Sequence, residues 1–100
     1  MESLTPEAKE LLVAAVAGGG DMLYLGSAGY TMILANKKDF VNPESGRTTE
    51  EWEHAVLELK TRGFIKEMGP NGEVFKVTQL GFIAAHAINT GTFDQSAPSA

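Results

Sequence analysis

The stretch from Thr48 to Thr78 constrains the fold more than any other part of the chain. Thr48 and Glu51 have the spacing of a capping box, in which the hydroxyl accepts a bond from the N3 amide and the carboxylate accepts one from the cap amide. We therefore expect a helix to begin at Thr48 and to end at Gly63, which can adopt the left-handed conformation that often follows a helix. Its apolar residues recur at the spacing of a buried stripe: Trp52, Ala55, Val56 and Leu59.

Two short strands are expected after this helix, at residues 64–68 and 74–78. The four residues from Gly69 to Gly72 between them suit a tight turn, because Pro70 presets one φ angle and Gly72 can adopt a positive one. Thr78 can then cap a final helix. The apolar spacing predicts which residues of that helix are buried: Leu80, Ile83, Ala84, Ala87 and Ile88.

The first half of the chain is predicted to contain one helix and a second hairpin. Thr5 can cap the helix, with Pro6 at its first position, and a run of three glycines ends it. Residues 22–25 and 30–35 are rich in β-branched, aromatic and long apolar side chains, as strands are. Residues 36–47 are mostly polar and are predicted to form a long irregular loop.

Length and composition indicate one globular domain, at residues 1–88, followed by a disordered tail or linker at 89–100. The chain has no cysteine, which excludes disulfides and thiolate metal sites. It also has no signal-peptide pattern and no apolar run of the roughly 18 residues that a membrane span needs. We therefore expect a soluble protein of the cytoplasm.

Two linked runs extend across the predicted helix, hairpin and last helix: Ala55-Val56-x-x-Leu59-x-x-x-Gly63-Phe64-Ile65 and Gly72-x-x-Phe75-x-Val77-Thr78-x-x-Gly81-x-x-x-Ala85. These runs resemble the second half of winged helix-turn-helix domains, and the chain also resembles small modules of uncharacterised bacterial proteins. The resemblance implies an α+β, winged-helix-like fold with a C-terminal β-hairpin wing. Together with the predicted elements, the order is helix, two strands, helix, two strands, helix.

The outer face of the predicted 48–62 helix is acidic, and this sign repels DNA phosphates. Our leading hypothesis is a non-enzymatic interaction or regulatory module that binds a protein, or another copy of itself, through this face. The candidate contact residues are Glu50, Glu53, His54, Leu57 and Glu58.

The alternative hypothesis is a DNA-binding transcriptional regulator of the winged helix-turn-helix type. Nucleic acid is disfavoured by the net charge of −5, although a local basic patch would still attract phosphates. The candidate contacts for this alternative are Lys37, Lys38, Arg47, Lys60 and Arg62.

A small hydrolase or metal protein is a third and weaker hypothesis. Glu50, His54 and Glu58 share a helix face, but one histidine with two flexible carboxylates is a poor transition-metal site. No nucleophile, base and orienting group come together in any motif. We therefore assign no catalytic residue, and we expect no cofactor and no metal.

Overall fold

The computed structural model describes residues 4–27, 30–41, 46–70 and 72–92. The protein is α+β, and the described residues form three helices and five strands. In chain order these are α1 (Pro6–Ala17), β1 (Asp21–Ser27), β2 (Tyr30–Ala35), β3 (Lys38–Asp39), α2 (Thr49–Thr61), β4 (Ile65–Met68), β5 (Val74–Val77) and α3 (Gln79–Asn89).

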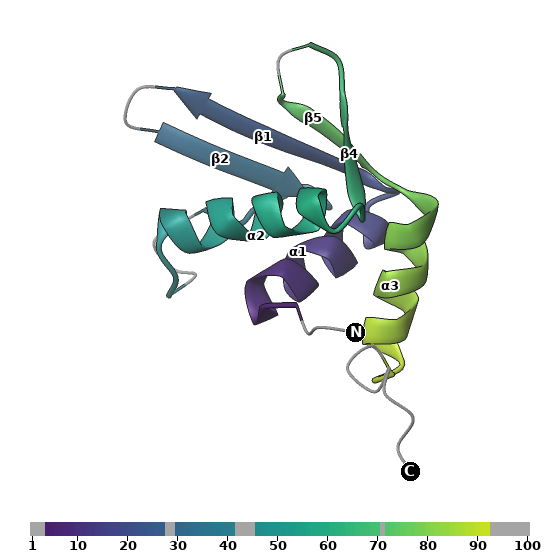
Figure 1. The fold of residues 1–100 in the computed structure, drawn as a ribbon. Helices are drawn as coiled ribbons and strands as arrows, with labels where there is room; N and C mark the ends of the chain where they lie inside the picture. Colours follow the sequence, from purple (N-terminus) through teal and green to yellow (C-terminus); the bar gives the residue numbers. More distant parts are fainter. Residues whose placement is uncertain (1–3, 28–29, 42–45, 71, 93–100) are drawn as a thin grey trace.

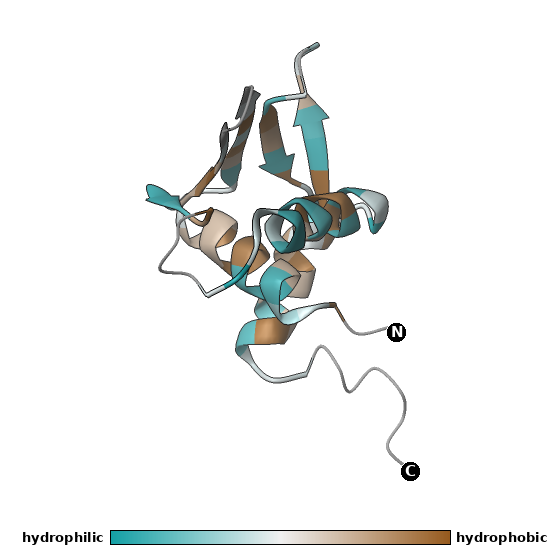
Figure 2. Ribbon diagram, turned by 90° about the vertical axis from the view of Figure 1, so that its left-hand side faces the viewer, coloured by the Kyte–Doolittle hydropathy of each residue, from teal (hydrophilic) through white to brown (hydrophobic). Residues whose placement is uncertain are grey.

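The five strands form one antiparallel sheet in the order β3-β2-β1-β5-β4, so β1 is its middle strand. β1 pairs with β2 over Met22–Ser27, but with β5 only over Asp21–Leu23, and the two hairpins diverge toward their tips (Figure 1). α1 and α2 lie on one side of the sheet, and α3 extends away from its edge (Figures 1 and 2). The fold is therefore two layers, with helices on one face of the sheet.

Local signals place the helix ends where the sequence predicts them. The Glu51 amide donates to Thr48 Oγ1 over 3.2 Å, and the Thr48 amide donates to Glu51 Oε1 over 2.8 Å, so the capping box is confirmed. Thr5 and Thr78 cap α1 and α3 in the same way through their hydroxyls. Gly63 ends the α2 segment with the predicted positive φ, 78°.

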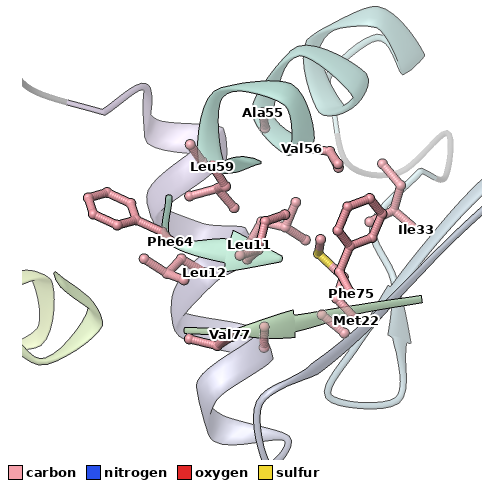
Figure 3. Packing of buried hydrophobic residues seen from close by; sticks show 14 of the residues in the cluster. Leu11, Leu12, Met22, Ile33, Ala55, Val56, Leu59, Phe64, Phe75 and Val77 are labelled. Atoms are coloured by element: carbon pink, nitrogen blue, oxygen red, sulfur yellow. The ribbon is translucent and has the colours of Figure 1, made fainter. Parts of the chain in front are cut away.

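The core lies between the sheet and the first two helices (Figure 3). Trp52 is its largest buried side chain and meets the Phe40 ring edge-on, with 5.2 Å between ring centres. The predicted buried stripe of α2 is confirmed, since all four of its residues are buried. α1 and the strands supply facing side chains, among them Leu11, Leu12, Met22, Ile33 and Phe75.

The loop predicted at residues 36–47 is regular in part. Asn36 and Lys37 have positive φ angles of 52° and 62°, and this two-residue turn leads into the short strand β3. Such a turn matches the twist of paired strands, but usually has glycine at its second position, so Asn-Lys gave no strong turn signal. Residues 42–45 of the predicted loop lie outside the described residues.

The predicted buried face of α3 is wrong in part. Leu80 and Ile83 are 51% and 59% exposed, whereas Gly81, Ala84 and Ala85 are buried. Gly81 lies against the Phe64 carbonyl, where a side chain would not fit. The helix therefore packs through its small residues and through the partly buried Ile88, whereas Leu80, Phe82 and Ile83 are exposed.

The observed element order does not match the predicted winged-helix order, because β3 is added. The β4–β5 hairpin, predicted as a C-terminal wing, is joined through β5 to β1 and is followed by α3. Asn71 of its predicted turn lies outside the described residues, and Gly72 has the expected positive φ of 67°.

The predicted boundary at residue 88 falls one residue before the end of α3 at Asn89. Thr90 caps the helix, and residues 93–100 of the predicted tail lie outside the described residues. Within the described ranges, no helix is long and apolar enough to cross a membrane.

Candidate functional site

A groove of about 410 Å³ runs along α2, where this helix faces β1, β4 and β5. Its floor is apolar and is formed by Val56 and Phe75, each 3% exposed. At its rim stands Leu57, which is 58% exposed although it belongs to the same helix. An exposed leucine beside an apolar floor gives this groove the chemistry of a small binding site.

Two polar bridges join α2 to the sheet at this groove. The Tyr24 hydroxyl of β1 donates to Glu53 Oε2 over 3.0 Å, and Lys60 Nζ lies 3.3 Å from Glu67 Oε1 of β4. Glu53 and Lys60 are seven residues apart, or about 10 Å along the helix. Leu57 lies between Glu53 and Lys60 in the sequence. It therefore stays exposed between the Tyr24–Glu53 and Lys60–Glu67 contacts.

The pKa of the Tyr24 phenol is raised by its surroundings. Burial of the phenol raises the pKa of Tyr24 above the usual 10.0. The hydrogen bond to the Glu53 carboxylate and the negative charge of Glu53 raise this pKa further. Glu53 Oε2 also accepts a bond of 3.4 Å from the Thr31 hydroxyl. At neutral pH the phenol is therefore a protonated donor that holds Glu53 in place.

The acidic side chains predicted to share the outer face of α2 point in different directions. Glu53 turns to the sheet and lines the groove, whereas Glu58 turns to α1 and accepts a 2.7 Å bond from the Thr5 hydroxyl. Glu50 and His54 are exposed, and His54 also lines the groove. The groove therefore brings together Glu53, His54 and Leu57 of the predicted contact residues, and leaves Glu50 and Glu58 outside it.

The predicted nucleic-acid contacts do not gather into one patch. Arg47 forms ion pairs with Glu7 and Glu10 of α1, at 2.7 and 2.8 Å, and its guanidinium lies 5.3 Å from the centre of the Trp52 ring. Its charge is therefore largely compensated within the chain. Lys60 lies in the last turn of α2, about 20 Å away along a helix of this length.

The other three basic candidates lie at opposite ends of the helical layer. Lys37 and Lys38 belong to the β2–β3 turn and strand, where the Lys38 ammonium lies 4.9 Å from the centre of the Phe40 ring. Arg62 follows α2 and lies 5.3 Å from the centre of the Phe64 ring. The five predicted contacts are therefore dispersed, with only Lys37 and Lys38 adjacent to each other.

A larger groove of about 570 Å³ lies beside α1, with Val13, Ala17 and Ile88 among its lining residues. Lys38 is the one predicted contact residue that lines it. The α2 groove is the stronger candidate because four of the predicted contact residues line it, Glu53, His54, Leu57 and Lys60, together with Tyr24. Among the described residues, no three His, Asp or Glu side chains form a cluster that could hold a metal ion.

Sequence reasoning missed Tyr24, Glu67 and Phe75, which complete the groove. They come from three different strands, β1, β4 and β5, and only the order of the strands in the sheet places all three beside α2. No local motif carries that information. No family model matches the chain, and neither a curated protein nor a solved structure is significantly similar to it.

Proposed function

We propose that this chain is a non-enzymatic, winged-helix-like interaction module that binds a protein segment in the α2 groove. The observation that carries the proposal is the exposed Leu57 at the rim of an apolar floor. A partner side chain that covers Leu57 and enters the groove removes apolar surface from water, which favours binding. The helix-hairpin-helix sequence from α2 to α3 supports the winged-helix description.

The charges at the rim indicate the chemistry of the partner. Glu53 and Glu67 line the groove with one cation, Lys60, which pairs with Glu67, and the exposed Glu50 precedes Glu53 by one turn of α2. Opposite charges across an interface speed association and exclude wrong partners. The partner segment is therefore expected to combine an apolar anchor with lysine or arginine, as one face of a basic amphipathic helix does.

The test is a titration of the isotope-labelled chain with a 14-residue amphipathic Leu/Lys peptide, followed by backbone amide shifts. The proposal expects saturable shifts centred on His54, Leu57 and Phe75. A second peptide, with the same lysines but glutamine in place of leucine, measures the attraction that arises from charge alone. It should bind more weakly and shift no residue of the groove floor.

Leu57→Ser is the variant that tests the anchor, and Leu80→Ser is its matched control. Both leucines are about half exposed on helices, but Leu80 lies on α3 away from the groove. Loss of one buried leucine contact removes about 1.5–3 kcal/mol, so Leu57→Ser should weaken binding by about tenfold or more. Equal affinity of both variants, or equal shifts with both peptides, would remove the groove as a binding site.

DNA binding, the alternative, has less support in the arrangement of charges. Arg47 is engaged by two carboxylates and Lys60 by one, so neither is available to phosphates without losing a partner. Of the remaining candidates, Lys37 and Lys38 are neighbours at β3, whereas Arg62 follows α2. A winged-helix-like protein of this charge is better suited to a protein partner than to a duplex.

A further inference from the structure

The face of the sheet that points away from α1 and α2, here called the outer face, carries an unbroken apolar row. Leu34, Leu23, Val74 and Met68 are successive register partners across β2, β1, β5 and β4. Leu25 and Met32 form a second apolar pair beside this row. Register partners share one face of a sheet, so these six side chains lie together.

The opposite face is identified by its contacts with α2. Tyr24 and Thr31, which alternate with the outer residues along β1 and β2, both bond to Glu53 of that helix. The helices lie on that side in both views of the fold (Figures 1 and 2). In the described part of the chain, therefore, no helix lies over the outer face.

An antiparallel sheet with one face in water normally alternates apolar and polar residues along its strands. β1 and β2 do not alternate, because Met22–Leu25 and Met32–Ala35 are apolar at every position. Val74 and Met68 are 39% and 38% exposed, and the four outer residues of β1 and β2 are half-buried. This composition is typical of strands that are covered on both faces.

We propose that the outer face is an interface between two copies of this chain, packed sheet against sheet about a two-fold axis along β1. Identical chains that form a dimer usually present the same patch to each other. β1 is the middle strand, with apolar partners on both of its sides. The axis therefore places Leu34 and Met32 of one copy over the Val74 and Met68 side of the other, so apolar surface meets apolar surface.

The shape of the outer face supports a second copy as the occupant. A hollow of about 260 Å³ lies on the β2 side of β1, with Leu23 and Leu34 among its lining residues. The more exposed pair, Val74 and Met68, lies on the β5 side. A two-fold axis along β1 places Val74 and Met68 of each copy over the hollow on the β2 side of the other copy. By symmetry this contact forms twice.

The charges on this face are also arranged for such a dimer. Asp21, Lys76 and Lys66 are register partners in one row at the margin of the apolar rows, and Lys76 Nζ lies 3.4 Å from Asp21 Oδ1. An apolar centre with a charged rim is the usual anatomy of a protein interface. The acidic residues of α2 belong to the other layer, so the net charge of −5 is not concentrated at the contact.

The size of the face indicates a weak, reversible dimer. A residue covers roughly 16 Å² of a sheet, from a rise of about 3.3 Å and a strand spacing of about 4.8 Å. The described strands therefore span roughly 400 Å² in each copy, or roughly 800 Å² in both together, which is less than about 1,200 Å², the size at which stable interfaces begin. We expect association to depend on concentration and to strengthen as added salt screens the like net charges.

The test is sedimentation equilibrium of the full chain from about 20 μM to about 1 mM, the range in which weak complexes dissociate. The average mass should rise toward that of a dimer. Isotope-filtered NOE spectra of a mixture of labelled and unlabelled wild-type chains should then show contacts between copies at Leu23, Leu25 and Met32. This measurement needs no variant, so it stays decisive if a substitution unfolds the sheet.

The variant Leu23→Thr/Val74→Thr places two hydroxyls at the centre of the apolar row. Threonine is β-branched and suits strands at both positions, which are direct partners in the register. Dimerisation should weaken by about tenfold or more, whereas Leu80→Thr, on the exposed side of α3, should leave it unchanged. A monomeric mass up to 1 mM would overturn the proposal, as would a dimer whose NOEs arise from α3 or the α2 groove.

Discussion

At the scale of single residues, the polar contacts of this chain divide into local and distant ones. Thr48 and Glu51 are three positions apart, and their capping box follows from spacing alone. Glu53 and Tyr24 are 29 positions apart, and Thr5 and Glu58 are 53 apart. The sequence therefore predicts the cap, but cannot show that Glu53 and Glu58 turn inward to distant partners.

The contact between Tyr24 and Glu53 leads to a prediction about pH. Because the pKa of the folded phenol is raised above 10.0, the unfolded chain loses this proton first as pH rises. The stabilisation is complete below about pH 10 and is lost as pH rises through the higher pKa of the folded state. The free energy of unfolding should therefore fall over this alkaline window.

Urea unfolding of the wild type and of Tyr24→Phe at several pH values isolates this effect from other titrating groups. The phenylalanine variant lacks the ionisable hydroxyl, so the stability difference between the two proteins should change above about pH 10. An ultraviolet titration should show phenolate at a higher pH in the folded wild type than in urea. A stability difference that stays constant from about pH 8 to about pH 12 would contradict the proposed environment of Tyr24.

At the scale of elements, the positions of helices and strands are well predicted where the buried face consists of large apolar side chains. The α2 stripe is of this kind, and its residues are all buried. α3 is different, because it packs through Gly81, Ala84 and Ala85 and exposes Leu80 and Ile83. Ala84, Ala87 and Ile88 pack against the core as predicted, but hydrophobic periodicity favours large residues, so it wrongly includes Leu80 and Ile83 and misses the close backbone approach at Gly81.

The packing of α3 predicts a strong effect of Gly81→Ala. An added Cβ would meet the Phe64 carbonyl oxygen and would lie 2.7 Å from Val77 Cγ1, so the helix must move away from the β4 end. Such overpacking costs about 1–3 kcal/mol and outweighs the helix propensity of alanine, which is worth about 1 kcal/mol. We expect a net loss of about 1–2 kcal/mol in the free energy of unfolding, measured by urea denaturation.

Gly26→Ala is the matched control, because a Cβ at Gly26 would meet no atom within 4 Å. Its stability should change by no more than about 0.5 kcal/mol, as for other substitutions at open sites. If both glycine variants lost the same amount, α3 would not be held by close contact at Gly81.

At the scale of the whole molecule, the α+β class follows from the order of predicted elements, but the sheet order does not. The placement of β1 between β2 and β5 joins the two hairpins into one sheet and creates the groove beneath it. Chain order alone leaves that pairing open. The sequence shows apolar residues on both faces of β1 and β2. It does not show that α1 and α2 cover only one of these faces, which the structure shows.

The distribution of charge over the whole molecule yields the last prediction, which concerns DNA. The chain carries a net charge of −5, and its basic candidates are separated or engaged, as Arg47 is by Glu7 and Glu10. Non-specific binding depends on the number of phosphates that are neutralised at once and is strongest at low salt. We therefore expect random duplex DNA at about 20 mM salt to shift no backbone amide of the labelled chain.

The double variant Glu7→Gln/Glu10→Gln is the control for this titration, because it removes the two carboxylates beside Arg47 and makes the net charge less negative. Any gain of DNA affinity in this variant would show that the ion pairs with Glu7 and Glu10 prevent Arg47 from binding phosphates. Salt-sensitive shifts in the wild type near Lys37, Lys38, Arg47, Lys60 and Arg62 would have the opposite meaning. They would show that dispersed cations act together on a duplex, and would favour a DNA-binding regulator over a protein-binding module.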